Sequence, residues 1–264
     1  MRSIVILALI CFCLAFIGCS GENAANKASA SPAPQAKPPG TREPVLVELF
    51  TSEGCGNCPP ADAQLAFLDE KQPVHSAEVI TLGYHVDYFN ARGWKDEYSS
   101  PVYTDRQNRY AKRWNLDSVF TPQMIVDGQT QFIGSDARKA TEAITKAAVP
   151  SKAKVDVRVN ENRVEINIEN IPPHGASGVF LAAAEDNLVT DVKAGNNNGK
   201  TLKHISVVRG LAEISPLQAN QNSFKTIAEV KPESKWKVEN LKYVVFVQES
   251  GSGKVIAVGQ GRAK

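Results

Sequence analysis

The segment VELFTSEGCGNCPPAD, residues 47–62, places two cysteines two residues apart, between an apolar run and a pair of prolines. The run VLVELF that leads into it is typical of a short buried strand. After the prolines, apolar residues recur at helical spacing: Ala61, Leu65 and Leu68. Two consecutive prolines fit the first turn of a helix but not its interior, so we expect a regular helix from about Pro59. The segment therefore predicts a strand, a turn that carries Cys55 and Cys58, and a helix.

The chain begins with a targeting segment that we exclude from the fold. Residues 4–17 are apolar and uncharged, follow Arg2, and fall short of the roughly 20 residues that a membrane-spanning helix needs. They end in FIGCS, which is similar to a bacterial lipobox and implies cleavage before Cys19 and lipidation of that residue; a plain signal peptide cut nearby is the alternative. We expect a lipoprotein signal peptide at residues 1–18 and, because large apolar residues are scarce there, a lipidated tether at residues 19–44.

Removal of the leader simplifies the cysteine count. Two cysteines lie in the leader and Cys19 carries lipid, which leaves Cys55 and Cys58 as the thiols of the mature protein. An exported compartment permits disulfides. Ser20 after the lipidated cysteine is similar to outer-membrane sorting signals, so we expect a lipid-anchored, periplasm-facing protein of the cell envelope at the outer membrane. The net charge is +2 and no Lys/Arg run is present, so no nucleic-acid partner is expected.

Beyond the cysteine segment, the pattern is that of an α/β layer. Apolar runs predict strands at residues 78–86 and on both sides of an Asp-Gly turn at residues 127–128. A helix is expected over residues 101–114, and another begins at Ser135 or Asp136 as its N-cap. The first of these helices lies in a polar and aromatic stretch between the predicted strands, which we interpret as a helical insertion.

From Ser151 the pattern becomes that of a β protein. KVDVRVNENRVEINIENI alternates apolar and polar residues on both sides of NENR, which predicts an antiparallel hairpin. Six further runs are strand-like: GVFLAAAE, LVTDV, LKHISVVR, SFKTIAEV, KYVVFVQE and KVIAVGQG. About eight short strands with turn signals predict an all-β sandwich-like domain at residues 151–264, with a boundary near Pro150. We interpret residues 194–204 as a turn between strands; the alternative is a binding loop for a partner.

The spacing of Cys55 and Cys58 suits thiol–disulfide exchange. A pair that opens a helix lies near unsatisfied N–H groups and a partial positive charge, which favour a thiolate on the first cysteine. The second sulfur is close enough to resolve a mixed disulfide. We therefore predict Cys55 as the attacking thiol and Cys58 as the resolving thiol. If CGNC forms a turn outside the helix, the effect of the helix on Cys55 is weaker.

The segment VLVELFTSEGCGNCPP resembles the active-site segment of thioredoxin-fold oxidoreductases. Thr121 and Pro122, just before QMIVDG, resemble the cis-proline position of that superfamily, which implies that Pro122 lies beside the cysteines and that Thr121 contacts the substrate. A wider set of motifs is similar to a bacterial exported family, domain of unknown function 1223: ELFTSEGCGNCPPAD, HVDYF, GWKDEYSSP, TDRQNRYA, TPQMIVDG and GNNNGKTLKHISVVR. The predicted fold class is an α/β thioredoxin-like domain with a helical insertion at residues 45–150, followed by an all-β sandwich-like domain.

Glu48 is the predicted proton acceptor of the pair. In thioredoxins the strand before the motif carries a buried carboxylate that exchanges protons with the resolving cysteine, and Glu48 occupies the middle of VLVELF. Burial in that apolar run should raise its pKa. The resemblance thus implies that Glu48 accepts the proton of Cys58. The alternative is that Glu48 points outward or pairs with a lysine.

The preferred function is an exported, lipid-anchored thiol–disulfide oxidoreductase that needs no cofactor or metal. Its expected partners are protein thiols or disulfides, a redox partner protein and, through the anchor, the membrane. Two alternatives remain: a non-catalytic binding or scaffold lipoprotein, and a protein that handles Cu(I) or another metal with the same thiolates. A purely structural disulfide is disfavoured because it closes a very small loop. His85 and Asp87 lie near the end of a predicted strand; we interpret them as fold support, and a contribution to the site is the alternative.

Overall fold

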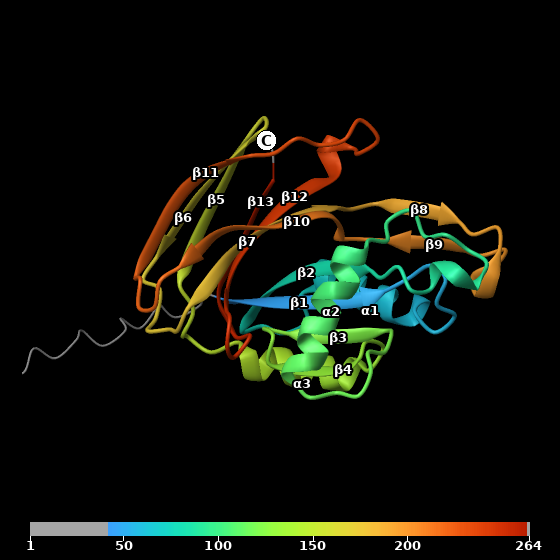
Figure 1. Ribbon diagram of the computed structural model, residues 1–264, viewed down its shortest axis with the longest axis horizontal. Coiled ribbons are helices and arrows are strands. Elements are labelled where there is room, and N and C mark those ends of the chain that lie inside the picture. The colour runs from blue at the N-terminus through green and yellow to red at the C-terminus, as the bar shows by residue number, and fades with distance from the viewer. Residues whose placement is uncertain (1–41, 263–264) are drawn as a thin grey trace, which may run out of the picture. The chain divides into compact units, whose positions relative to one another are not determined.

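An eight-stranded mixed sheet organises the chain, of which the computed structural model describes residues 42–262 (Figure 1). Its strand order is β13-β12-β7-β10-β2-β1-β3-β4. A three-stranded sheet, β11-β6-β5, and a two-stranded sheet, β8-β9, complete the β structure of this part of the chain. The strands and α-helices are β1 (Glu43–Thr51), α1 (Pro59–Lys71), β2 (Ala77–His85), α2 (Pro101–Arg113), β3 (Gln123–Val126), β4 (Thr130–Ile133), α3 (Ala137–Ala147), β5 (Lys154–Asn160), β6 (Arg163–Glu169), β7 (Ser177–Glu185), β8 (Leu188–Asp191), β9 (Thr201–His204), β10 (Val207–Leu217), β11 (Ser223–Glu229), β12 (Leu241–Glu249) and β13 (Val255–Arg262).

The predicted division into a thioredoxin-like α/β domain and a separate β-sandwich is wrong. β10, from the second half of the chain, pairs in parallel with β2 at Val207 and Gly83, and β7, β12 and β13 extend the same sheet. The described chain is therefore mostly β, with strands of both halves in one sheet. Local alternation predicted the strands but not their partners. At this contact the Gly83 N–H donates to the Ser206 carbonyl at 2.8 Å, so β10 covers part of the edge that β2 would otherwise leave open.

The register of β1 and β2 brings two polar side chains to one edge of the sheet. β1 pairs in parallel with β2 from Glu43 opposite Ala77 to Thr51 opposite His85, and antiparallel with β3. Parallel strands end at the same edge, so Thr51 and His85 lie side by side where the chain leaves the sheet. The cysteine segment follows directly after this edge.

The predicted helices are confirmed. α1 begins at Pro59, with both prolines in its first turn, and buries its apolar stripe, Ala61, Leu65 and Leu68. α2 begins after Ser100, whose hydroxyl accepts a hydrogen bond from the Val102 N–H at 3.3 Å. α3 begins after the N-cap Asp136. Within the β1–β3 region, α1 and α3 pack on one face of the sheet, whereas α2 packs on the other.

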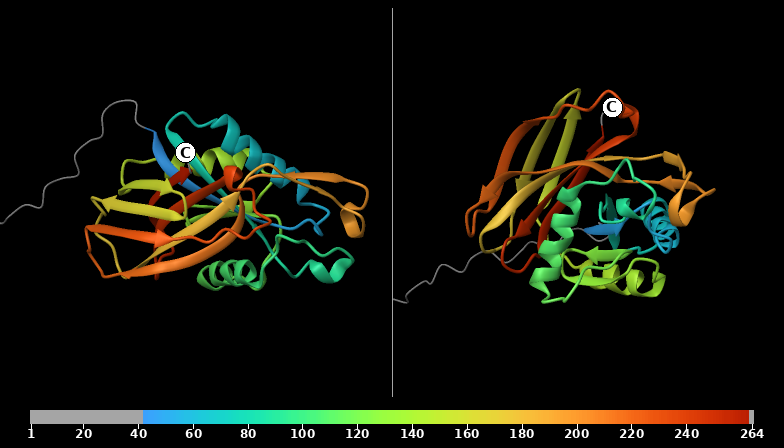
Figure 2. Two further views of the ribbon diagram at one scale, coloured as in Figure 1. Left: turned by 90° about the horizontal axis from the view of Figure 1, so that it is seen from above. Right: turned by 45° about the vertical axis from the view of Figure 1, so that its right-hand side comes forward.

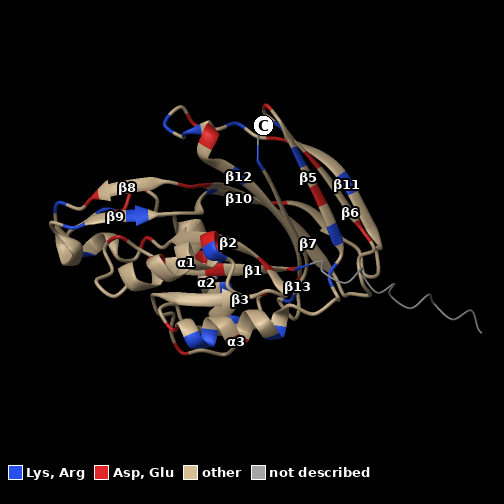
Figure 3. Cartoon of the chain, turned by 180° about the vertical axis from the view of Figure 1, so that it is seen from behind, with Lys and Arg blue, Asp and Glu red and all other residues tan. Residues whose placement is uncertain are grey.

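The three-stranded sheet packs against the C-terminal strands of the large sheet (Figure 2). Its hairpin of β5 and β6 is the predicted one, and alternate residues of β6 are buried: Val164, Ile166 and Ile168. The exposed positions carry charges of both signs, which Figure 3 shows along β5, β6 and β11. This sheet therefore shares its core with β7, β12 and β13 and does not form an independent domain.

One predicted strand is divided in the structure. The run LKHISVVR contains the end of β9 and the start of β10, with Ser206 between them at a positive φ of 53°. This conformation redirects the chain, so β9 pairs with β8 whereas β10 enters the large sheet. The β8–β9 hairpin consequently extends beyond the large sheet, and β9 contacts α1 (Figures 1 and 2).

A buried ion pair lies in the core between β1 and α2. The Arg106 Nε donates to Glu48 Oε1 at 2.6 Å, and the Tyr110 hydroxyl donates to Glu48 Oε2 at 2.5 Å. Arg106 is 3% exposed and Glu48 is fully buried. Four aromatic rings surround the guanidinium: Tyr84, Tyr110, Phe180 and Phe246. Burial opposes the charge of Arg106, but the charge and hydrogen bond of Glu48, together with Tyr110 and Tyr84, raise the pKa of Arg106 well above its ordinary value.

No helix within residues 42–262 is both long and apolar enough to cross a membrane. The predicted signal peptide, the lipidated Cys19 and nearly all of the predicted tether lie outside the described residues.

Replacing Arg106 by Met should lower the free energy of unfolding by about 3–5 kcal/mol, because Glu48 then stays buried without its cation. Denaturant unfolding with the disulfide intact measures this change. The control is Arg138→Met, which removes a pair with Glu142 in which both side chains are more than half exposed, and should cost at most about 1 kcal/mol. Equal losses for the two variants would contradict the central role of the buried pair.

Candidate active site

Cys55 and Cys58 form a disulfide at the start of α1, with their Cα atoms 5.4 Å apart. The intervening turn is closed by a hydrogen bond from the Cys58 N–H to the Cys55 carbonyl at 3.2 Å. Gly56 and Asn57 at its tip are exposed, whereas Cys55 is 2% exposed and Cys58 is fully buried. The turn therefore faces solvent, and the sulfurs lie just behind it.

Cys58 is the N-cap of α1, and CGNC lies outside the regular helix, as the two prolines predicted. Pro59 and Pro60 have no N–H. The N–H groups of Ala61 and Asp62 donate to the Cys58 carbonyl at 2.8 and 3.0 Å. The first turn thus has no free backbone donor for a sulfur, and the predicted stabilisation of a thiolate by free donors of the helix is not provided here.

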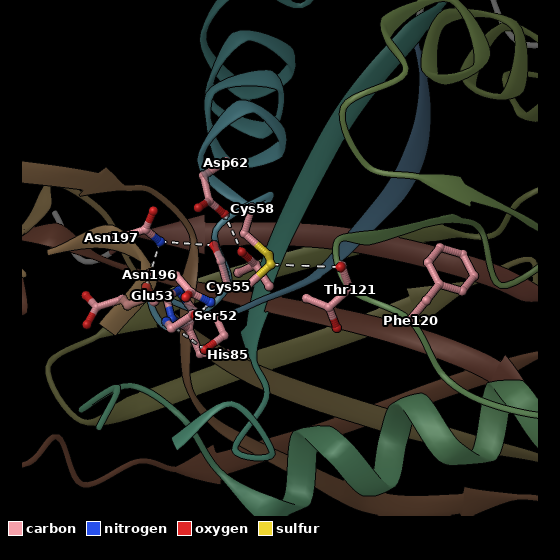
Figure 4. The surroundings of a disulfide bond; sticks show 12 residues. Ser52, Glu53, Cys55, Cys58, Asp62, His85, Phe120, Thr121, Asn196 and Asn197 are labelled. Carbon is pink, nitrogen blue, oxygen red and sulfur yellow. Dashed lines mark hydrogen bonds between the residues drawn. A yellow bond between two sulfur atoms is a disulfide. The ribbon is translucent and has the colours of Figure 1, made fainter. Parts of the chain in front are cut away.

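The structure brings Thr121 and Pro122 to the disulfide. The peptide bond between them is cis. The Cys55 Sγ lies 3.8 Å from the Thr121 carbonyl oxygen, a contact drawn in Figure 4. The Thr121 hydroxyl forms a short hydrogen bond with the Tyr88 hydroxyl, which also donates to the Gln107 side chain at 3.1 Å. Cys55 therefore lies against the loop before β3, where a partly exposed Thr121 borders it.

The structure does not bring Glu48 to the cysteines. Side chains alternate between the faces of β1, and Glu48 points to α2, where Arg106 and Tyr110 bind it. Cys58 caps α1, which packs on the opposite face. The residue of β1 that faces the start of α1 is Thr51. The predicted role of Glu48 as proton acceptor for Cys58 thus has no geometric support.

A pair of buried titratable groups lies behind the disulfide. The His85 Nδ1 is 2.7 Å from the Asp96 Oδ2, and both residues are 1% exposed. Asp96 also accepts hydrogen bonds from the Glu53 and Tyr98 N–H groups at 2.9 and 3.0 Å. Burial disfavours the charged form of each partner and is the largest single effect, but the opposite charge and the hydrogen bonds together outweigh it. As a result the pKa of His85 is raised and the pKa of Asp96 is lowered.

A second imidazole comes from β9. The His204 Nε2 lies 3.3 Å from the Glu53 Oε1, and the other Glu53 oxygen accepts from the Trp94 indole N–H at 2.8 Å. The rings of His204 and His85 meet edge to face with centroids 4.9 Å apart. Both Glu53 and His204 are buried. Two histidine–carboxylate pairs therefore meet at this edge of the sheet, and His204 is the member that comes from the second half of the chain.

Asp62 completes the cluster from α1. Its carboxylate accepts a hydrogen bond from the Thr51 hydroxyl at 2.7 Å, and its side chain is partly buried. Burial raises the pKa of Asp62, although His204 and His85 act in the opposite direction. A cavity of about 10 Å³ lies among the side chains of this cluster; its lining includes Thr51, Asp62, His85 and His204.

The loop between β8 and β9 holds the cysteine segment in place. The fully buried Asn197 donates from its side-chain amide to the carbonyls of Glu53 and Cys55 at 2.8 and 3.0 Å (Figure 4). Asn196 donates to the Gly54 carbonyl at 3.3 Å. Residues 194–204 are therefore part of the site. The sequence pattern predicts a turn at these residues and fold support from His85; the run of three asparagines is the one local signal of a role in the site.

No group of three or more His, Cys, Asp or Glu residues that could hold a metal ion is found between residues 42 and 262. This includes the cluster behind the disulfide, where each imidazole lies beside a carboxylate.

A family model described as "Protein of unknown function (DUF1223)" matches residues 46–248. Among solved structures, protein AGR_C_4864 from Agrobacterium tumefaciens is 26% identical, with a TM-score of 0.68 over 83% of this chain and 94% of that chain. HBP35 of Porphyromonas gingivalis is 14% identical, with a TM-score of 0.62 over 84% of this chain and 76% of that one, a likeness of fold. No curated protein matches. A domain of the outer membrane lipoprotein Omp28 from Porphyromonas gingivalis, 13% identical, covers 44% of this chain and 91% of that chain at a TM-score of 0.25, too low to carry an argument.

Replacing Asn197 by Ala should loosen the cysteine segment, because two buried carbonyls lose their side-chain donor. We expect a loss of about 1–3 kcal/mol in the free energy of unfolding. Hydrogen exchange should also accelerate in residues 52–58. The neighbouring, exposed Asn198 gives the control variant Asn198→Ala, which should leave both measurements unchanged. Unaltered exchange in Asn197→Ala would show that the loop does not hold the segment.

The pair of His85 and Asp96 should make stability depend on pH. The pKa of His85 is raised in the folded state above about 6.5, the value in an unfolded chain. Its protonated form therefore stabilises the fold below about pH 6.5, and this contribution disappears as pH rises through the folded-state pKa. The difference in unfolding free energy between wild type and His85→Gln should shrink over that range. His75→Gln, at an exposed position, is the control and should show no such change.

Proposed function

The chain belongs to this family of proteins of unknown function, DUF1223, and we propose that it is an exported thiol–disulfide oxidoreductase. The observation that carries the proposal is the disulfide between Cys55 and Cys58, behind an exposed turn and against Thr121. A pair at this spacing can be opened by an attacking thiolate and closed again by the second thiol. The surrounding hydrogen bonds hold the turn in one position, as an exchange site requires.

Cys55 is the sulfur that exchanges with substrate. It lies at the contact with the loop before β3, whereas Cys58 is fully buried at the start of α1. In the oxidised protein, a substrate thiolate attacks Cys55 and displaces Cys58. In the reduced protein, the Cys55 thiolate attacks a substrate disulfide, and Cys58 then attacks Cys55 to release the product. Thr121, which is partly exposed beside Cys55, is placed to contact the bound substrate.

The substrates that fit this site are protein thiols or disulfides, together with a redox partner protein that restores the starting state. No cofactor is required, because both electrons pass between sulfur atoms. The exposed tip at Gly56 and Asn57 supports access by another protein.

The proposed location is the cell envelope, where disulfides persist. The support is the N-terminal sequence: an apolar run after Arg2, followed by FIGCS and a tether poor in large apolar residues. In this proposal Cys19 carries the lipid, and the protein faces the periplasm from the outer membrane. In cells grown with a radioactive fatty acid, the wild-type protein should become labelled and the Cys19→Ala variant should not. This result would support the lipid anchor.

The purified protein should reduce insulin with a thiol donor or rearrange scrambled disulfides in a test protein. Cys55→Ser should lose this activity completely, because no sulfur remains for attack. Cys58→Ser should accumulate a mixed disulfide at Cys55, because the resolving thiol is missing. Melting curves establish that both variants are folded.

Equal rates for wild type and Cys55→Ser would refute the enzyme function and favour a scaffold role. Tighter Cu(I) binding by reduced wild type than by Cys55→Ser, without exchange activity, would favour metal handling. The reduction potential of the pair decides the direction of exchange. A value near −270 mV indicates a reductant, and one near −120 mV an oxidant, both as approximate reference points.

A further inference from the structure

Opening the disulfide places a negative charge on the buried Cys58 sulfur. When the bond breaks, the electron pair stays on the Cys58 sulfur, whose residue is fully buried. A buried thiolate is strongly disfavoured unless a donor or a cation compensates it. Neither proline of the first turn has an N–H, and the next two N–H groups already bind the Cys58 carbonyl. The helix start therefore leaves the charge uncompensated, and a proton must come from a side chain.

Asp62 is placed to supply that proton. It lies four residues after Cys58, and its N–H donates to the Cys58 carbonyl in the first helical hydrogen bond, so the two side chains are neighbours on one face of the helix. Figure 4 shows Asp62 on α1 above the disulfide. Its carboxylate is held by Thr51, and the residue as a whole is only partly buried. It can therefore exchange a proton with bulk water between turnovers.

We propose that Asp62 gives the proton that Cys58 takes up when the disulfide opens, and that the pairs His85–Asp96 and His204–Glu53 set the pH at which it does so. This inference rests on the proposed exchange function of the cysteines. It replaces Glu48, which is held by Arg106 on the other face of the sheet.

The proposed reaction proceeds in two exchange steps. A thiolate of a dithiol substrate attacks the Cys55 Sγ, a substrate–Cys55 bond forms, and the bond between Cys55 and Cys58 breaks with its electron pair on Cys58. The Asp62 carboxyl gives its proton to Cys58, which becomes a thiol, and Asp62 becomes a carboxylate. The second substrate thiolate then attacks the first substrate sulfur and releases Cys55 as a thiolate. The substrate loses two electrons and becomes a disulfide, and Asp62 regains a proton from solvent.

Titratable groups face Asp62 from each element around the start of α1. His85 comes from β2 and His204 from β9, and Glu53 and Asp96 lie behind them from the segments after β1 and β2. Positive imidazolium rings favour the Asp62 carboxylate, and the two acids behind them weaken that effect. The cavity of about 10 Å³ between Asp62 and the two rings is close to the space that one water requires. Burial raises the pKa of Asp62, which keeps its acid form available at higher pH than an exposed aspartate.

The test is the rate at which dithiothreitol opens the disulfide of the purified protein, followed by acid quench, alkylation and mass measurement. After correction for the thiolate fraction of dithiothreitol, the wild-type rate should fall as pH rises through the range in which Asp62 loses its proton, and that range should lie above the titration range of an exposed aspartate. Asp62→Asn keeps the side-chain shape and an acceptor for Thr51. At the acidic end it should be slower than wild type by about 100-fold, within the range of general acid catalysis, and its corrected profile should be flat.

Three further variants make the measurement specific. Glu70→Gln removes an exposed carboxylate from the same helix and should react as wild type does. His204→Gln and His85→Gln should each shift the inflection of the wild-type profile, which a purely structural role would not do. An Asp62→Asn profile equal to that of wild type would overturn the proposal.

A second measurement needs no variant. The side-chain carboxyl carbon of Asp62, followed by NMR, should titrate at different pH values in the oxidised and reduced protein, because proton and electron uptake are coupled. The same titration in both states would overturn the proposal. Dithiothreitol is a small molecule, so these results do not depend on activity toward protein substrates. If the protein does not act on insulin but its disulfide still opens at a rate that depends on Asp62, the proposed function is refuted and the proton transfer from Asp62 is supported.

Discussion

The ion pair between Glu48 and Arg106 is the interaction on which the arrangement of the chain depends. It joins β1 to α2, and the rings around the guanidinium include Phe180 and Phe246 from the second half of the chain. Two buried charges are compatible with a stable fold only when they remain paired, because burying either one alone carries a desolvation cost of several kcal/mol. The first strand, the central helix and the C-terminal strands are therefore constrained around one point.

This constraint explains why the molecule does not divide at Pro150. The strands after Pro150 pack around the same core as β1 and β2, and they continue the same sheet. Continuity of the sheet then positions the β8–β9 hairpin over the start of α1. Asn197 and His204 reach the cysteine segment because β10 is fixed beside β2. The second half of the chain thus contributes to the site as well as to the core.

The two faces of β1 have separate roles. The face that carries Glu48 is closed by the ion pair and aromatic rings, and it contributes to stability. The opposite face ends in Thr51, which binds Asp62 beside the cysteine helix. A strand alternates sides at every residue, so a carboxylate in the middle of an apolar run can face either way. Sequence placed Glu48 correctly in the buried strand but could not decide its face, and its expected partner was wrong for that reason.

The sequence by itself determined the local elements and the position of the cysteine pair between a strand and a helix. Apolar spacing and capping residues predicted α1, α2, α3 and the hairpins, and the two prolines predicted where α1 begins, because these depend on interactions between near neighbours. The tertiary structure decided which strands share a sheet, and hence that His85, Asp96, Glu53 and His204 converge behind Cys58. The pairing of β2 with β10 joins Gly83 to Val207, more than 100 positions apart. Whether two such strands pair depends on which strand edge is still free after the rest of the chain has folded. A local sequence pattern does not contain this information.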